Sequence, residues 1–154
     1  MKYLLFSICC LLGGITLQAQ QEYVWDGYGI GFTLADDFVE VTNDEDEFSA
    51  DGDGMSFSIV PFSNEELDEN DLTAYTISIF DELDITRTDA ISKIRLNGFV
   101  GGYALGASDD TRLFVMGLID PDSDTNFFVI ITFFDDDHVA VEEAIRICKS
   151  LHRL

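Results

Sequence analysis

The chain is poor in cysteine. Two of its three cysteines, Cys9 and Cys10, lie near the start, so the rest of the sequence holds only Cys148. A lone cysteine excludes an intramolecular disulfide there, and a hydrophobic core must hold the fold. Cys148 continues the helical spacing of the apolar residues Ala144 and Ile145. We therefore predict a buried structural thiol, with a nucleophile or an intermolecular bridge as the alternatives.

Basic residues are also scarce. The sequence has 8 Lys and Arg against 30 Asp and Glu, which gives a formal net charge of −22. Residues 20–86 hold 19 of the acids and no base. A field of this sign repels nucleic acid and anionic lipid, so neither is an expected partner. It suits either a solubilising surface or a partner protein with a basic surface.

Catalytic and cofactor motifs are missing as well. The sequence has no G-x-S-x-G elbow, no H-E-x-x-H, no C-x-x-C and no G-x-x-x-x-G-K loop. The glycines of residues 27–32 have the spacing G-x-G-x-G inside a strand pattern, which is not a dinucleotide fingerprint. The two histidines, His138 and His152, lie on or beside the last helical segment. We predict no catalytic residue, no cofactor and no enzymatic activity.

The first nineteen residues have the pattern of an export signal. Lys2 precedes a mostly apolar run over residues 3–15, and Ala19 supplies a small residue at a cleavage site. The run is shorter than the roughly 20 apolar residues of a membrane span, so a membrane anchor is the weaker alternative, as is a lipoprotein at Cys9 and Cys10. We predict a signal peptide over residues 1–19, export, and a single domain over residues 20–154 without stable membrane insertion.

Several segments have the periodicity of strands. Residues 113–119 and 127–134 are almost continuously hydrophobic, which is typical of central strands covered on both faces. Residues 29–34 and 55–62 alternate apolar and polar positions, and Pro61 places the second of these strands toward a sheet edge. We expect four residues of the central strands to be buried: Phe114, Met116, Phe128 and Ile130.

Two shorter features of the first half carry alternatives. Residues 43–54 are acidic and rich in turn residues, and they predict a short edge strand near Phe48 without the ligand spacing of an EF-hand. The aromatic residues Tyr23, Trp25 and Tyr28 either close one end of the core or form an exposed platform for a sugar or peptide. We favour the core, because burial of aromatic rings is strongly stabilising.

Two segments have helical periodicity. The first begins with the capping-box spacing of residues 63–66, and its apolar stripe predicts a helix of about 14 to 20 residues. That stripe consists of Leu72, Tyr75, Ile79, Phe80 and Leu83. The second helix closes the chain, with the stripe Val141, Ala144, Ile145, Cys148 and Leu151 or His152. The acidic run 135–137 before it is interpreted as N-terminal capping, with a metal site that includes His138 as the alternative.

These segments predict an α+β domain with an antiparallel sheet of about six strands, in the order β-β-β-α-β-β-β-α, covered by the two helices. The early strand GIGFTLADDFV, the meander through residues 96–98, 114–119 and 127–134, and the final helix ending ICKSLH carry a resemblance to a known superfamily. The chain resembles the PsbP-like α/β/α sandwiches, which include photosystem accessory proteins, Mog-type Ran-binding proteins and periplasmic relatives of the DcrB type. The resemblance implies a non-enzymatic domain that binds other proteins.

We therefore expect an exported, acidic accessory domain that acts through protein contacts. The alternatives are a small carboxylate-dependent hydrolase and a weak calcium-binding extracellular module. Asp120, Asp122 and Asp124 alternate in a turn and are the candidate calcium ligands. Thr125 and Ile131 stand where a calcium loop would have glycine and glutamate, so we favour a hairpin turn with solvated acids and no metal.

Overall fold

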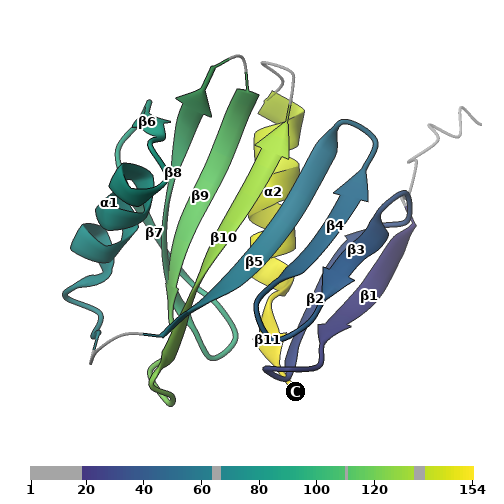
Figure 1. Ribbon diagram of the computed structural model, residues 1–154, viewed down its shortest axis with the longest axis horizontal. Coiled ribbons are helices and arrows are strands. Elements are labelled where there is room, and N and C mark those ends of the chain that lie inside the picture. Colours follow the sequence, from purple (N-terminus) through teal and green to yellow (C-terminus); the bar gives the residue numbers. More distant parts are fainter. Residues whose placement is uncertain (1–18, 64–66, 110, 134–137) are drawn as a thin grey trace, which may run out of the picture.

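The computed structural model describes residues 19–63, 67–109, 111–133 and 138–154. Within those ranges the chain forms two sheets and two helices (Figure 1). The strands before the first helix are β1 (Gln20–Trp25), β2 (Ile30–Ala35), β3 (Val39–Asn43), β4 (Phe48–Gly52) and β5 (Met55–Ser63). The later elements are α1 (Leu72–Glu82), β6 (Thr86–Arg87), β7 (Ser92–Arg95), β8 (Val100–Ser108), β9 (Thr111–Ile119), β10 (Thr125–Phe133), α2 (His138–Ser150) and β11 (His152–Arg153).

The larger sheet has the strand order β3-β4-β5-β10-β9-β8-β6, with β7 also paired to β8. The neighbours pair antiparallel, and the two most hydrophobic runs of the sequence, β9 and β10, lie near its middle. The predicted α+β class and antiparallel sheet are therefore confirmed. The described residues form eleven strands and not about six. Three of the missed strands have only two to four residues, too few to show a period of their own.

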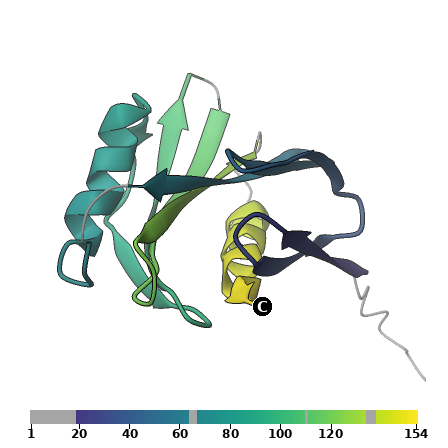
Figure 2. The ribbon, with the colours of Figure 1, turned by 60° about the horizontal axis from the view of Figure 1, so that its bottom comes forward.

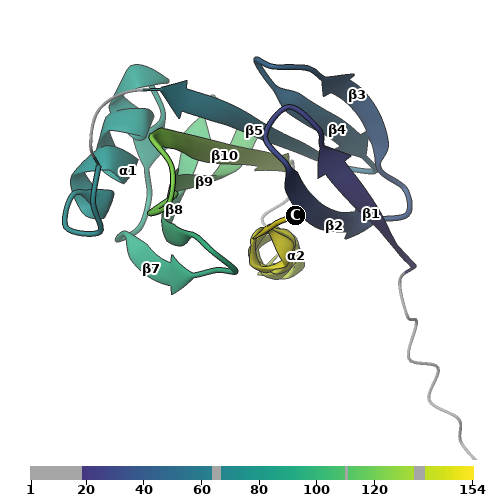
Figure 3. The same ribbon diagram turned by 90° about the horizontal axis from the view of Figure 1, so that it is seen from below.

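The smaller sheet has the order β1-β2-β11 and lies with α2 on one side of the larger sheet (Figure 3). Between them is an aromatic core, in which Phe32 of β2 lies 4.7 Å from Phe48 and 4.9 Å from Phe57, measured between ring centroids. From α2, Ala144, Ile147 and Cys148 are buried in the same core. Burial of the Cys148 thiol confirms its structural role in packing.

The helix α1 packs on the opposite side of the larger sheet, over β8 and β9 (Figure 2). Glycines in those strands allow the close approach. A Cβ at Gly102 would lie 2.7 Å from the Thr76 hydroxyl oxygen, and one at Gly117 would lie 2.9 Å from it. The Thr76 hydroxyl lies 2.8 Å from the Leu72 carbonyl oxygen of its own helix and 3.1 Å from the Gly102 carbonyl oxygen, so the helix and β8 are in close polar contact at this point.

The first helix begins later than predicted. The observed helix α1 starts at Leu72. Ser63 ends β5 opposite Thr125, so it is not a helix cap. Residues 64–66 lie outside the described residues. The turn before the helix is held by side chains instead, because the Asn70 N–H donates to Asp68 Oδ1 at 2.6 Å. Strand pairing therefore overrides the capping-box spacing at this position.

The second helix lies where it was expected, from His138 to Ser150, with a modified stripe. Ile147 is buried, a residue that the predicted stripe did not contain. His152 does not belong to the helix, because it forms β11 and pairs with Gly31 of β2. The acids 135–137, predicted to cap this helix, lie outside the described residues.

Two strands predicted to lie at an edge are interior. Phe48 in β4 is fully buried between β3 and β5, and β3 forms the edge of the sheet. Strand β5 pairs with both β4 and β10 up to Ile59. Pro61 lies beyond that residue and pairs only toward β10, opposite Phe127, so proline occupies a position with one paired neighbour, as it does in edge strands.

The prediction for the aromatic residues near the start is confirmed in its favoured form. Tyr23 and Trp25 are buried, and their polar atoms donate to the carbonyl oxygens of Phe38 and Asp44, both at 2.6 Å. These bonds tie β1 to the two ends of β3. An exposed platform is excluded for these two rings.

In the described residues, no helix has the length and hydrophobicity needed to span a membrane.

Candidate functional site

The larger sheet has a surface that neither helix covers in the described part of the chain. Phe114 and Met116 of β9 are fully buried as predicted, but Phe128 and Ile130 of β10 are only half-buried. The expectation that β10 is buried on both faces is therefore wrong. The reason is the position of α1, which packs mainly over β8 and β9 (Figure 1). It reaches β5 and β10 through Tyr75, whose ring lies 5.2 Å from that of Phe62 and whose hydroxyl donates to the Phe127 carbonyl oxygen at 2.8 Å, so these strands are only partly covered on that side.

Strand register shows which side chains share this surface. Phe128 lies opposite Val60, Ile130 opposite Ser58, and Thr132 opposite Ser56. The same rows continue to Ser49 and Asp51 in β4 and to Val39 in β3. We call this set the open face, and it consists of Val39, Ser49, Asp51, Ser56, Ser58, Val60, Phe62, Phe128, Ile130 and Thr132.

The open face has an apolar part and a small polar part. Val60, Phe62, Phe128 and Ile130 form a half-buried apolar group beside α1. At the other end, Val39 on the edge strand is 68% exposed. An apolar surface that the fold does not cover is typical of a protein interaction site.

The charge of the open face is negative. Asp51 is exposed on it, and Glu47 accepts a hydrogen bond from the Ser58 hydroxyl there. The strands β3, β4 and β5 contain no Lys or Arg, because the sequence has none between residues 20 and 86. The surface therefore combines an apolar centre with carboxylates on strands that carry no Lys or Arg.

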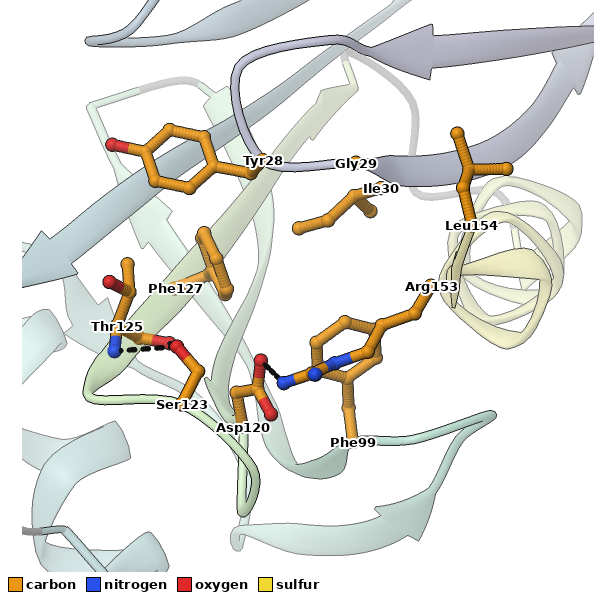
Figure 4. Close-up of a pocket in the computed structure, with 10 residues that line it drawn as sticks. All are labelled: Tyr28, Gly29, Ile30, Phe99, Asp120, Ser123, Thr125, Phe127, Arg153 and Leu154. Atoms are coloured by element: carbon orange, nitrogen blue, oxygen red, sulfur yellow. Dashed lines mark hydrogen bonds and ion pairs between the residues drawn. The ribbon is translucent and has the colours of Figure 1, made fainter.

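A separate cavity of about 230 Å³ lies at one end of the sheets (Figure 4). It is formed by the turn before β2, the turn between β9 and β10, and the last residues of the chain. Its apolar walls are Tyr28, Ile30, Phe99, Phe127 and Leu154, and the remaining lining residues are Gly29, Asp120, Ser123, Thr125 and Arg153. Phe127 points from β10 to the side opposite the open face, so the two features are separate.

An ion pair forms one wall of the cavity. Asp120 is only 6% exposed and pairs with the Arg153 guanidinium of β11. The guanidinium carbon also lies 5.7 Å from the centre of the Phe99 ring, a cation–π arrangement. Strand β11 carries Arg153 to this position by pairing with Ile30, and a strand of two residues is too short to have a hydrophobic period in the sequence.

The three candidate calcium ligands are placed differently from one another. Asp120 is buried, whereas Asp122 and Asp124 are exposed in the turn. The Asp122 N–H donates to Asp120 Oδ1 at 3.0 Å, and Asp120 Oδ2 pairs with Arg153. Both oxygens of Asp120 thus have partners in the protein. Among the described residues, no three Asp, Glu, His or Cys side chains come together in a metal-binding arrangement.

A carboxylate-dependent hydrolase would need a carboxylate beside a cavity, and Asp120 occupies such a position. Its oxygens are already bonded to Arg153 and to the turn, which suits an ionised structural role. The hydroxyl of Ser123 accepts the Thr125 N–H at 2.9 Å and lies 3.5 Å from the Thr125 carbonyl oxygen. These contacts are with the backbone of the turn, whereas an activated serine is hydrogen-bonded to a basic side chain.

The fold places the chain among known structures. It resembles the Ran-binding protein Mog1p of Saccharomyces cerevisiae, with a TM-score of 0.63 and 10% sequence identity over 88% of this chain and 96% of that chain. It also resembles the cyanobacterial PsbP (CyanoP) of Synechocystis, with a TM-score of 0.63 and 11% identity over 92% of this chain and 96% of that chain. The predicted PsbP-like and Mog-type resemblance is thereby confirmed at the level of the fold.

A larger protein shares the fold as well. A structure from Bacteroides thetaiotaomicron matches with a TM-score of 0.55 and 14% identity over 88% of this chain, and this chain spans 48% of that one. No family model matches the sequence, and no curated protein matches it. The class is therefore defined by its architecture: an α+β, PsbP-like sandwich.

Proposed function

We propose that the chain is an exported, non-enzymatic accessory domain that binds another protein through the open face. The observation that carries the proposal is the uncovered surface of β5 and β10, where Val60, Phe128 and Ile130 remain half-buried beside α1. An interface that included them would bury apolar area that the fold itself leaves in contact with water. Mog1p, a Ran-binding protein, supports this class of function on the same fold.

The partner should present apolar side chains surrounded by Lys and Arg. Asp51 and Glu47 place negative charge on the open face, and no base of the first half offsets it. Complementary charge around an apolar centre accelerates association and sets specificity. The same field disfavours nucleic acid and anionic lipid as partners.

Export rests on the N-terminal pattern of residues 1–19, which lie almost entirely outside the described residues. Cleavage after Ala19 would leave β1, which starts at Gln20, at the mature N-terminus. The domain then lies in the periplasm or outside the cell. N-terminal sequencing of the protein from its native cells tests this part, and a start before Cys10 would contradict it.

The binding proposal is tested by co-purification from the native envelope fraction with a tagged mature chain. Asp51→Lys reverses a charge on the open face, and Asp26→Lys makes the same change of charge in the exposed β1–β2 turn. We expect a bound protein with the wild type and with Asp26→Lys, recovered about tenfold less with Asp51→Lys. Equal recovery with the two variants would refute the open face as the binding surface.

A hydrolase is the second candidate, because Asp120 is buried beside a cavity. It predicts turnover of an ester, amide or glycoside probe that is lost in Asp120→Asn at unchanged fold. The binding proposal predicts no turnover with either protein. The two assays are independent, so one result does not decide the other.

A further inference from the structure

We propose that the cavity between β2, β10 and β11 binds a single planar aromatic ring. The ring could belong to a small aromatic molecule or to a Tyr or Trp side chain of another protein. This site is separate from the open face, because Phe127 and Phe128 point to opposite sides of β10. The proposal therefore does not depend on the proposed function.

The size of the cavity fits one ring. Its volume is about 230 Å³. An apolar cavity of about 150 Å³ holds benzene, and sites for drug-sized ligands begin at about 300 Å³. The cavity therefore has room for a phenol or an indole.

The walls of the cavity are aromatic on two sides. The ring of Phe127 lies 5.3 Å from that of Tyr28 and 6.3 Å from that of Phe99, nearly perpendicular in both cases. Figure 4 shows these rings around the open space, with Arg153 reaching across the side opposite Tyr28. Perpendicular rings at this distance leave ring faces and edges available to a further aromatic group.

The guanidinium of Arg153 adds a planar cationic wall. One side of it lies over Phe99, and Asp120 holds one of its nitrogens. Its side chain is 36% exposed, so it is only partly covered by the protein. A guanidinium plane stacks on aromatic rings better than on aliphatic groups.

The charges select a neutral ring over an anionic one. Arg153 is already neutralised by Asp120, so an added carboxylate would meet Asp120 without a free cation to balance it. Asp122 and Asp124 lie in the same turn, and the chain carries a formal net charge of −22. A neutral aromatic ring avoids this repulsion and keeps the stacking contact.

Trp25 does not line the cavity, but it packs against two of its walls and provides a reporter. It is the only tryptophan of the chain, and its ring lies 4.4 Å from Tyr28 and 5.8 Å from Phe127. Its indole N–H therefore gives one identifiable resonance next to two walls of the cavity. Titration with p-cresol should shift this resonance saturably, with a dissociation constant on the order of 1 mM, within the limits known for small ligands.

Three further probes define the chemistry. We expect binding at least about fivefold weaker for 4-methylcyclohexanol, which has similar size and the same hydroxyl but neither a planar ring nor a π face, and for 4-methylbenzoate, which is anionic. N-acetyl-tyrosinamide distinguishes the two sources of the ring. Tighter binding than p-cresol indicates a side chain of a partner protein, and weaker binding indicates a free aromatic molecule.

Two variants test the walls. Arg153→Lys keeps a positive charge for Asp120 and removes the guanidinium plane, so p-cresol should bind about threefold to tenfold more weakly. Arg146→Lys, on the exposed side of α2, is the matched control and should not change the affinity. Tyr28→Leu should weaken binding while Tyr28→Phe preserves it, which gives a second test if Arg153→Lys is poorly folded.

Several results would overturn the proposal. The first is the absence of a saturable shift of the Trp25 resonance at p-cresol concentrations well above the millimolar range. Equal affinity for p-cresol and 4-methylcyclohexanol would reduce the site to a general apolar cavity. Tighter binding of 4-methylbenzoate would show that the guanidinium is free to bind anions.

Discussion

The hydroxyl oxygen of Thr76 in α1 lies 3.1 Å from the carbonyl oxygen of Gly102 in β8. This contact is possible only because Gly102 has no Cβ, which would lie 2.7 Å from the same hydroxyl. The helix is thereby held over β8 and β9. Its position there leaves β10 and β5 only partly covered and so creates the open face.

Substitution of Gly102 by alanine should destabilise the protein by about 1 to 3 kcal/mol, because the added methyl group overpacks against Thr76 and Leu72. Gly27→Ala is the control, since the nearest atom to its added Cβ is 3.7 Å away, and it should change the free energy of unfolding by less than about 0.5 kcal/mol. Denaturant unfolding measures both values. Equal stability of the two variants would mean that α1 is not held closely against β8.

Truncation of an aromatic residue should cost more stability in the covered part of the sheet than on the open face. Phe114→Ala should cost about 3 to 5 kcal/mol, because the ring is fully buried. Phe128→Ala should cost about 1 to 2 kcal/mol, because its ring is half-buried on the open face. A loss for Phe128→Ala as large as that for Phe114→Ala would show that the surface at β10 is covered in solution.

The stability of the protein should fall in alkaline solution. Burial raises the pKa of the Cys148 thiol and of the Tyr75 phenol above their ordinary values of 9.0 and 10.0, and for Tyr75 the nearby Glu82 adds to the shift. Above those values the unfolded chain loses protons that the folded chain keeps. The contribution of these two groups to the free energy of unfolding is therefore complete below about pH 9 and is lost as the pH rises further.

Denaturant unfolding measured at increasing pH tests this prediction. The free energy of unfolding of Cys148→Ala should decrease less steeply with pH than that of the wild type. The same burial should protect Cys148 from a water-soluble thiol reagent until the protein unfolds. Rapid stoichiometric labelling of the native protein would mean that α2 does not pack as described.

Calcium should bind weakly and without dependence on Asp122. Both oxygens of Asp120 have partners in the protein, and the side chains of Asp122 and Asp124 are exposed. Calorimetric titration should show a dissociation constant no better than about 10⁻⁴ to 10⁻³ M, equal in the wild type and in Asp122→Asn. Saturable micromolar binding that is lost in the variant would establish a calcium site in this turn.

Hydrophobic periodicity predicted the long elements of the fold, because they bury one or two regular faces. Strands β9 and β10, the helix α2 and burial of its Ala144 and Cys148 are predicted from the sequence, whereas burial of Ile147 is not. Strand β11 was not, because two residues have no period and their pairing with β2 depends on tertiary structure. The end of β5 at Ser63 was missed for the same reason.

The candidate sites were much harder to predict from the sequence than the fold. Phe128 and Ile130 have the composition of core residues, and only the placement of α1 over Gly102 and Gly117 leaves them half-buried. The pair of Asp120 and Arg153 joins residues 33 positions apart in the sequence (153 − 120). One signal was present in the chain: glycines in β8 and β9 indicate close packing of another element.

Site-specific photo-crosslinking tests the central claim most directly. A benzoylphenylalanine placed at Ser56, on the open face beside Asp51, is compared with one placed at Lys149, on the exposed side of α2. In native cells we predict an adduct with another protein from position 56, strongly reduced when Asp51→Lys is added, and no adduct from position 149. An adduct from position 149 alone, or equal adducts from both positions, would contradict the assignment of the open face as the binding surface.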